Sequence, residues 1–160
     1  METIYIMEDL SLIIEQSAYS FLWRYVQENG YGLEHGGILA GTMNPLKHQI
    51  TVTDVTTPFE RDKQTRYSFK RAVQGHQAAM DKIWQSSDHR KTYLGEWHTH
   101  NEDVPIPSYV DVRNWKEISK RNHNSRHLFF AIVGRREIKV WTVESGNVIE
   151  LKRCALQLEK

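Results

Sequence analysis

His98 and His100, two histidines separated by one residue, are the side chains best suited to chemistry in this 160-residue chain. Because side chains alternate along a strand, histidines at this spacing face the same side of a sheet and can bind one metal ion. Asp111 follows eleven residues after His100, at the start of an expected helix. Two imidazoles and one carboxylate leave a fourth position open for water, which is the ligand pattern of a catalytic zinc site.

Two further side chains supply the other groups that hydrolysis requires. Glu34 directly precedes a Gly-rich stretch and is the candidate proton carrier. Ser108 lies three residues before Asp111 and is the candidate hydrogen-bond donor to an oxyanion. The same Ser-x-x-acid spacing is also typical of an ordinary helix cap, and the two roles are compatible. We expect the neighbouring His35 to be exposed.

The elements that position these groups alternate between strands and helices. His98 ends a predicted strand over residues 92–98, and Glu34 precedes a strand over 36–43 that pairs with 49–55. A loop containing Pro105 and Pro107 leads to a helix that begins at Ser108. We therefore expect an α/β or α+β fold with a mixed sheet between helices.

The remaining elements are predicted from periodicity and turn residues. Ser17 is the expected N-cap of a first helix that ends at Asn29-Gly30. A second helix is expected from Phe69 to Trp84. Further strands are predicted at residues 4–7, 12–14, 127–133, 137–143 and 148–151, and the run 127–133 is apolar enough to be buried on both faces.

Composition excludes several classes of protein. The chain has 21 Lys and Arg against 20 Asp and Glu, so its net charge of +1 argues against a dedicated nucleic-acid-binding domain. Residues 61–71 hold five basic side chains, which we expect to form a solvated face. No apolar run approaches the roughly 20 residues of a membrane span, and the single Cys154 cannot form an internal disulfide. We expect a cytoplasmic monomer without nucleic-acid or membrane partners.

The combination of Glu34 before Gly-Gly with His-x-His, seven residues, Ser, two residues and Asp resembles the JAMM (MPN+) metalloprotease family. The resemblance implies that residues 1–160 form a single peptidase domain with the MPN fold, a mixed curved β-sheet flanked by helices. It also implies one Zn²⁺ bound by His98, His100 and Asp111, with Glu34 and Ser108 as catalytic residues. One departure is Asn101, where the family often has Pro, and we expect it to alter the rigidity of the loop and not zinc binding.

A narrower resemblance involves Gly95-Glu96-Trp97 before the histidines, the Pro-x-Pro-Ser stretch, and Asn114 and Trp115 after Asp111. These residues look like the small JAMM peptidases of bacterial CBASS antiphage operons. That branch implies a protein substrate, a conjugated CD-NTase whose C-terminus is joined to amines by an operon-encoded ligase. This chain would then be the deconjugating isopeptidase.

Other functions fit the same residues. The chain could process ubiquitin-like C-terminal tails in general, or it could be an MPN-type module that binds such a tail without cutting it. A third alternative is a non-haem iron enzyme, because two histidines and one carboxylate also bind Fe(II). The identity of the bound metal separates the zinc and iron alternatives.

Overall fold

The structure is a computed structural model that describes residues 2–57, 63–64, 69–70, 73–121 and 127–154. One nine-stranded sheet has the order β10-β9-β8-β7-β3-β4-β2-β1-β11. Three α-helices lie within the described residues. The helices are α1 (Gln16–Asn29), α2 (Val73–Ser86) and α3 (Tyr109–Lys120), and the strands of the sheet are β1 (Thr3–Met7), β2 (Leu10–Ile14), β3 (Gly36–Asn44), β4 (Gln49–Val55), β7 (Thr92–Thr99), β8 (Phe129–Val133), β9 (Ile138–Glu144), β10 (Asn147–Glu150) and β11 (Lys152–Cys154).

The sheet is mixed and strongly curved. Strands β2 and β4 pair in parallel, as do β7 and β8, and the other neighbouring strands of the sheet are antiparallel. The hydroxyl of Tyr5 on β1 donates a hydrogen bond of 2.6 Å to the carbonyl of Ile138 on β9, from near the opposite end of the strand order. The sheet therefore curls until its two ends nearly meet. This architecture confirms the predicted mixed α/β fold class.

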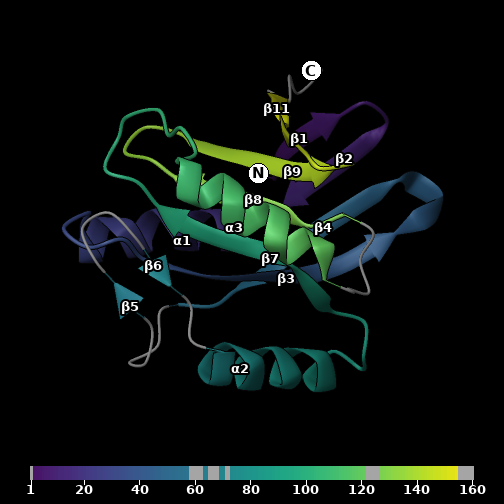
Figure 1. Cartoon of the computed structure of the whole chain (residues 1–160). Coiled ribbons are helices and arrows are strands. Elements are labelled where there is room, and N and C mark those ends of the chain that lie inside the picture. Colours follow the sequence, from purple (N-terminus) through teal and green to yellow (C-terminus); the bar gives the residue numbers. More distant parts are fainter. Residues whose placement is uncertain (1, 58–62, 65–68, 71–72, 122–126, 155–160) are drawn as a thin grey trace, which may run out of the picture.

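The helices cover both faces of the sheet. Helix α1 buries Ala18, Leu22 and Val26 against one face. Met80 of α2 and Trp115 of α3 belong to apolar clusters on the other face, and Figure 1 shows α3 lying across the central strands. None of the helices described is long and apolar enough to cross a membrane.

Strand β8 lies at the centre of this layered arrangement. All five of its residues are buried, as predicted for an apolar strand covered on both faces. Its alternate side chains join the cluster around α1 and the cluster around α3. Strand β7 pairs with β8 in parallel, so the histidine-bearing strand is held against the most buried part of the sheet.

Several predicted boundaries are wrong. Ser17 is not the N-cap of α1, because Glu15 occupies that position and the helix starts at Gln16. The backbone N–H of Glu15 still donates to Val52 on β4, so the chain passes directly from sheet to helix. Phe69 belongs to β6 (Phe69–Lys70), which pairs with β5 (Lys63–Gln64), and not to α2. Strand β11 was not anticipated. Most of the basic segment 61–71 lies outside the described residues.

Candidate metal centre

The two histidines lie where β7 leaves the sheet. His98 is paired with Gly36 on β3 and with Ile132 on β8, so its backbone is held from both sides. His100 follows the strand, and its N–H donates to the carbonyl of Val133 at 3.1 Å. The Nε2 atoms of the two imidazoles are consequently 3.1 Å apart. Both rings face one side of the sheet, as the spacing predicted, while Trp97, which precedes His98, is buried in the α1 cluster on the other side.

Glu34 lies in the segment that leads into β3. His35, the next residue, exchanges hydrogen bonds with Thr99: its N–H donates to Thr99 Oγ1 and its carbonyl accepts from the Thr99 N–H, both at 2.9 Å. Gly37 allows the close approach of the Thr56 carbonyl, because a Cβ at residue 37 would overlap that oxygen. Held in this way, the Glu34 carboxylate lies 3.8 Å from His100 Nε2.

Asp111 is placed by the cap of α3. Its carboxylate accepts a hydrogen bond of 2.8 Å from the Ser108 N–H, and its own N–H donates to Ser108 Oγ at 3.1 Å. This capping box confirms the predicted helix start. Trp115, one turn further on, stacks on Phe130 of β8 and has its ring centroid 6.2 Å from that of His98. The first turn of α3 is thereby fixed over the end of β7.

The donor atoms lie at separations compatible with a tetrahedral metal site, with a different Asp111 oxygen facing each histidine. His98 Nε2 lies 3.2 Å from Asp111 Oδ1, and His100 Nε2 lies 3.1 Å from Asp111 Oδ2. Ligands bound to zinc at about 2.0–2.1 Å and at a tetrahedral angle stand about 3.3–3.4 Å apart. The three observed separations are within a few tenths of an ångström of that value. Glu34 joins the group, with its donor atom and those of both histidines all within 4.8 Å of one another.

The four side chains are largely buried and strongly coupled. Their exposed fractions are 12% for His98, 8% for His100, 14% for Asp111 and 11% for Glu34. Burial raises the pKa of Glu34, although the two imidazoles oppose this effect. Burial alone would also raise the pKa of Asp111, but hydrogen bonds from His100 and His98 hold that pKa well below its usual range. Burial would lower the pKa of His100, but the contact with Asp111 outweighs it and raises that pKa.

Ser108 is available for a second interaction. Its oxygen accepts the cap hydrogen bond from Asp111, and a hydroxyl that accepts in this way can still donate its proton. His35 differs from the prediction, because it is buried and not exposed. Its Nδ1 lies 3.4 Å from the Tyr25 hydroxyl, and its backbone holds the end of β7.

Glu102 is a neighbour of the site that the sequence did not indicate. Its carboxylate lies 3.6 Å from His100 Nδ1, on the side of the ring that faces away from the other donors. The position two residues after His100 falls in a loop, where no periodicity predicts the direction of a side chain. The contact is visible only once the loop has been placed.

The curved mixed sheet flanked by helices is the fold of JAB-like domains. The chain belongs to the Prok-JAB family, described as prokaryotic homologs of the JAB domain, and the family model matches residues 16–144. The resemblance found in the sequence is therefore confirmed at the level of the family.

Three relatives that match most of this chain carry the name CD-NTase/cGAS isopeptidase. The protein from Pseudomonas aeruginosa is 34% identical over 124 residues, which cover 78% of this chain and 77% of that protein. The proteins from Escherichia coli and Vibrio cholerae are 28% and 29% identical over 145 residues, covering 91% of this chain and 90% of each relative. The solution structure of DSY2949 from Desulfitobacterium hafniense has a similar fold, with a TM-score of 0.62 at 16% identity, covering 87% of this chain and 88% of that chain.

Proposed function

We propose that this protein is a zinc-dependent isopeptidase that removes a conjugated CD-NTase from its targets. The observation that carries the proposal is the convergence of His98, His100 and Asp111, in which the two Nε2 atoms are 3.1 Å apart and each lies 3.1–3.2 Å from one oxygen of the Asp111 carboxylate. A non-cleaving binding module has no need for three convergent metal ligands beside a buried glutamate. The complete set of donors therefore favours an enzyme.

His98, His100 and Asp111 would hold the metal ion, with Glu34 outside this ligand set. Asp111 approaches both imidazole nitrogens closely, whereas the Glu34 contact with His100 is longer, at 3.8 Å. Zinc bound there would supply a Lewis acid and lower the pKa of its water to about 7.

The other residues would move protons and stabilise charge. Glu34 accepts a proton from the water that attacks the amide carbon, and then donates it to the nitrogen of the departing amine. Burial of Glu34 raises its pKa, which suits a carboxylate that must first take up and then release a proton. Ser108 donates a hydrogen bond to the oxygen of the attacked carbonyl as negative charge develops there. One amide bond and one water thus become a carboxylate terminus and a protonated amine.

The substrate is assigned from the relatives. Three proteins that match this chain over most of its length are named CD-NTase/cGAS isopeptidase. We therefore propose a protein substrate in which the C-terminus of a CD-NTase is joined to an amine, and we place the reaction in the cytoplasm. A direct test offers the purified protein two lysine conjugates, one of a CD-NTase tail and one of a ubiquitin-like tail. Cleavage of the first alone supports the assignment, and equal cleavage of both favours a general tail processor.

The metal itself is tested by elemental mass spectrometry of protein purified without added metal. About one zinc per wild-type chain is expected, with loss of that zinc in His98→Ala. His48→Ala is the matched control, because His48 is exposed, pairs with Asp9, and lies beside the end of β3 opposite to the one that pairs with His98. Iron in the wild type would support the non-haem enzyme, and zinc retained by His98→Ala would remove His98 from the ligand set. No metal even after zinc is supplied would favour the binding module.

A further inference from the structure

His100 has a polar atom that the metal centre does not use. Its Nε2 faces the other donors, at 3.1 Å from both His98 Nε2 and Asp111 Oδ2. A neutral imidazole that offers the Nε2 lone pair carries its proton on Nδ1. Within the described part of the chain, His100 Nδ1 is buried and has no hydrogen-bond partner. A buried N–H without an acceptor is energetically costly, so an acceptor is expected near His100 Nδ1.

The nearest carboxylate to this N–H is that of Glu102. Its Oε1 lies 3.6 Å from His100 Nδ1, too far for a hydrogen bond but within reach of a small adjustment. Its Oε2 accepts a hydrogen bond of 3.2 Å from the Ile106 N–H, which turns the other oxygen toward the ring. Its carbonyl accepts from the Arg135 N–H at 2.6 Å, so the backbone of Glu102 is fixed as well.

We propose that Glu102 is a positioning residue that accepts the Nδ1–H of His100 and so fixes the tautomer and orientation of this metal ligand. A charge-assisted N–H···O bond is about 2.7–2.9 Å long, so the two atoms must approach by less than about 1 Å. A carboxylate behind a ligating histidine holds the ring in place and makes it a stronger ligand. The proposal deepens the proposed function and depends on His100 being a metal ligand.

The adjacent Asp103 holds the same loop in place through contacts with Arg135 and Arg136. Its carboxylate lies 2.9 Å from Arg135 Nε and 3.8 Å from Arg136 Nε, and its carbonyl accepts from the Arg136 N–H at 3.0 Å. The turn between β8 and β9 therefore holds the loop after Asn101. Because Asp103 forms the ion pairs with these arginines, the Glu102 carboxylate is not needed for them and can interact with His100.

Measurements of zinc affinity distinguish the role of Glu102 from that of Asp103. We would measure the zinc dissociation constant of the full chain by competition with a chromophoric chelator, in the wild type, Glu102→Gln and Asp103→Asn. Both variants lose one negative charge at similar exposure, 48% for Glu102 and 50% for Asp103. The amide oxygen of Gln can still accept from Ile106. The dissociation constant should rise about tenfold or more in Glu102→Gln and much less in Asp103→Asn, whose amide oxygen can still accept from Arg135 Nε.

A second measurement needs no variant. In the cobalt-loaded wild type, the Nδ1 proton of His100 should give a paramagnetically shifted NMR signal that exchanges slowly with water, because Glu102 accepts it. Equal zinc affinity in the wild type and Glu102→Gln, or fast exchange of that proton, would overturn the positioning role. A wild type that binds no metal would instead overturn the proposed function.

Discussion

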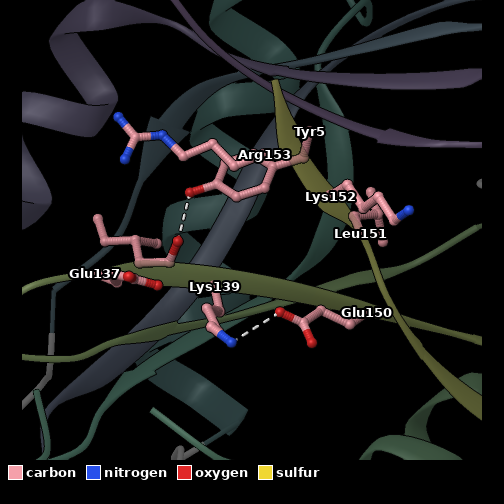
Figure 2. Close-up of a pocket in the computed structure, with 8 residues that line it drawn as sticks. Tyr5, Glu137, Lys139, Glu150, Leu151, Lys152 and Arg153 are labelled. Carbon is pink, nitrogen blue, oxygen red and sulfur yellow. Dashed lines mark hydrogen bonds and ion pairs between the residues drawn. The ribbon is translucent and has the colours of Figure 1, made fainter. Parts of the chain in front are cut away.

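The metal centre and the place where the sheet closes are both polar, yet they are built differently. At the closure, a hollow of about 560 Å³ lies between the ends of the curved sheet. Figure 2 shows two polar contacts in this hollow, one from the Tyr5 hydroxyl to a backbone carbonyl and one between Lys139 and Glu150. The charged atoms of the second pair are 3.0 Å apart. At the metal centre, by contrast, two carboxylates and two imidazoles converge on one point.

The difference teaches which polar clusters are built for chemistry. In the closure hollow, the Tyr5 hydroxyl and the Lys139 ammonium each meet an acceptor within the protein, so neither group calls for a ligand. In the metal centre, the carboxylates of Glu34 and Asp111 raise each other's energy, and Asp111 contributes to the raised pKa of Glu34. Several lone pairs that point at one place in a buried site are stabilised by a cation. The convergence of these donor atoms, and not polarity alone, therefore distinguishes the metal centre from the closure hollow.

The strongest test of the comparison removes the proton carrier. Glu34→Gln should lower kcat by about 10²- to 10⁴-fold, because the amide cannot accept the proton of the attacking water. Zinc content should remain that of the wild type, since Glu34 lies outside the proposed ligand set. The same substitution in the closure hollow, Glu150→Gln, should leave kcat unchanged. Normal turnover by Glu34→Gln would refute the role of this residue.

A somewhat smaller loss is expected at the cap of α3. Ser108→Ala should lower kcat by about 10²- to 10³-fold through loss of the oxyanion donor. It should also lower the free energy of unfolding by about 0.5–2 kcal/mol, because the Asp111 N–H loses its acceptor. Ser108→Thr keeps a hydroxyl and serves as the control that restores both properties. Steady-state kinetics and urea unfolding measure the two effects, and an unchanged kcat in Ser108→Ala would leave only the capping role.

In the closure hollow the expected effect is on stability alone. Tyr5→Phe removes the hydrogen bond to Ile138 and leaves a buried carbonyl without its donor. The free energy of unfolding should fall by about 1–3 kcal/mol. Kinetics and zinc content should not change, and Tyr109→Phe, at an exposed tyrosine, provides the control for stability. A loss of zinc in Tyr5→Phe would show that the two regions are coupled.

The smallest effect is expected for the ion pair of that hollow. Lys139→Met removes the partner of Glu150 at a site where both side chains are partly exposed to solvent. Such pairs contribute only about 0–1 kcal/mol to the free energy of unfolding, so the midpoint temperature of thermal unfolding should change little. A loss well above that range would mean that the hollow depends on its charges as much as the metal centre does.

Local patterns in the sequence were sufficient to predict most helices and strands and to identify the candidate metal ligands. The apolar run of β8, the glycine end of α1 and the Ser108–Asp111 cap each depend on neighbours in the chain, and the structure has them where they were predicted. The exceptions involve distant partners. Strand β11 forms because β1 offers it an edge, and α1 starts before Ser17 because Glu15 is still bonded to β4.

The sequence by itself determined the family, the mixed fold class and the set of chemical groups, because spacing along the chain specifies which side chains share a face or cap a helix. Tertiary structure alone decided how Glu34, from the start of β3, and Asp111, from α3, approach the two histidines. It also decided that His35 is buried and that Glu102 lies behind His100. Such contacts depend on how strands pair and loops are braced, and these are interactions between residues far apart in the sequence.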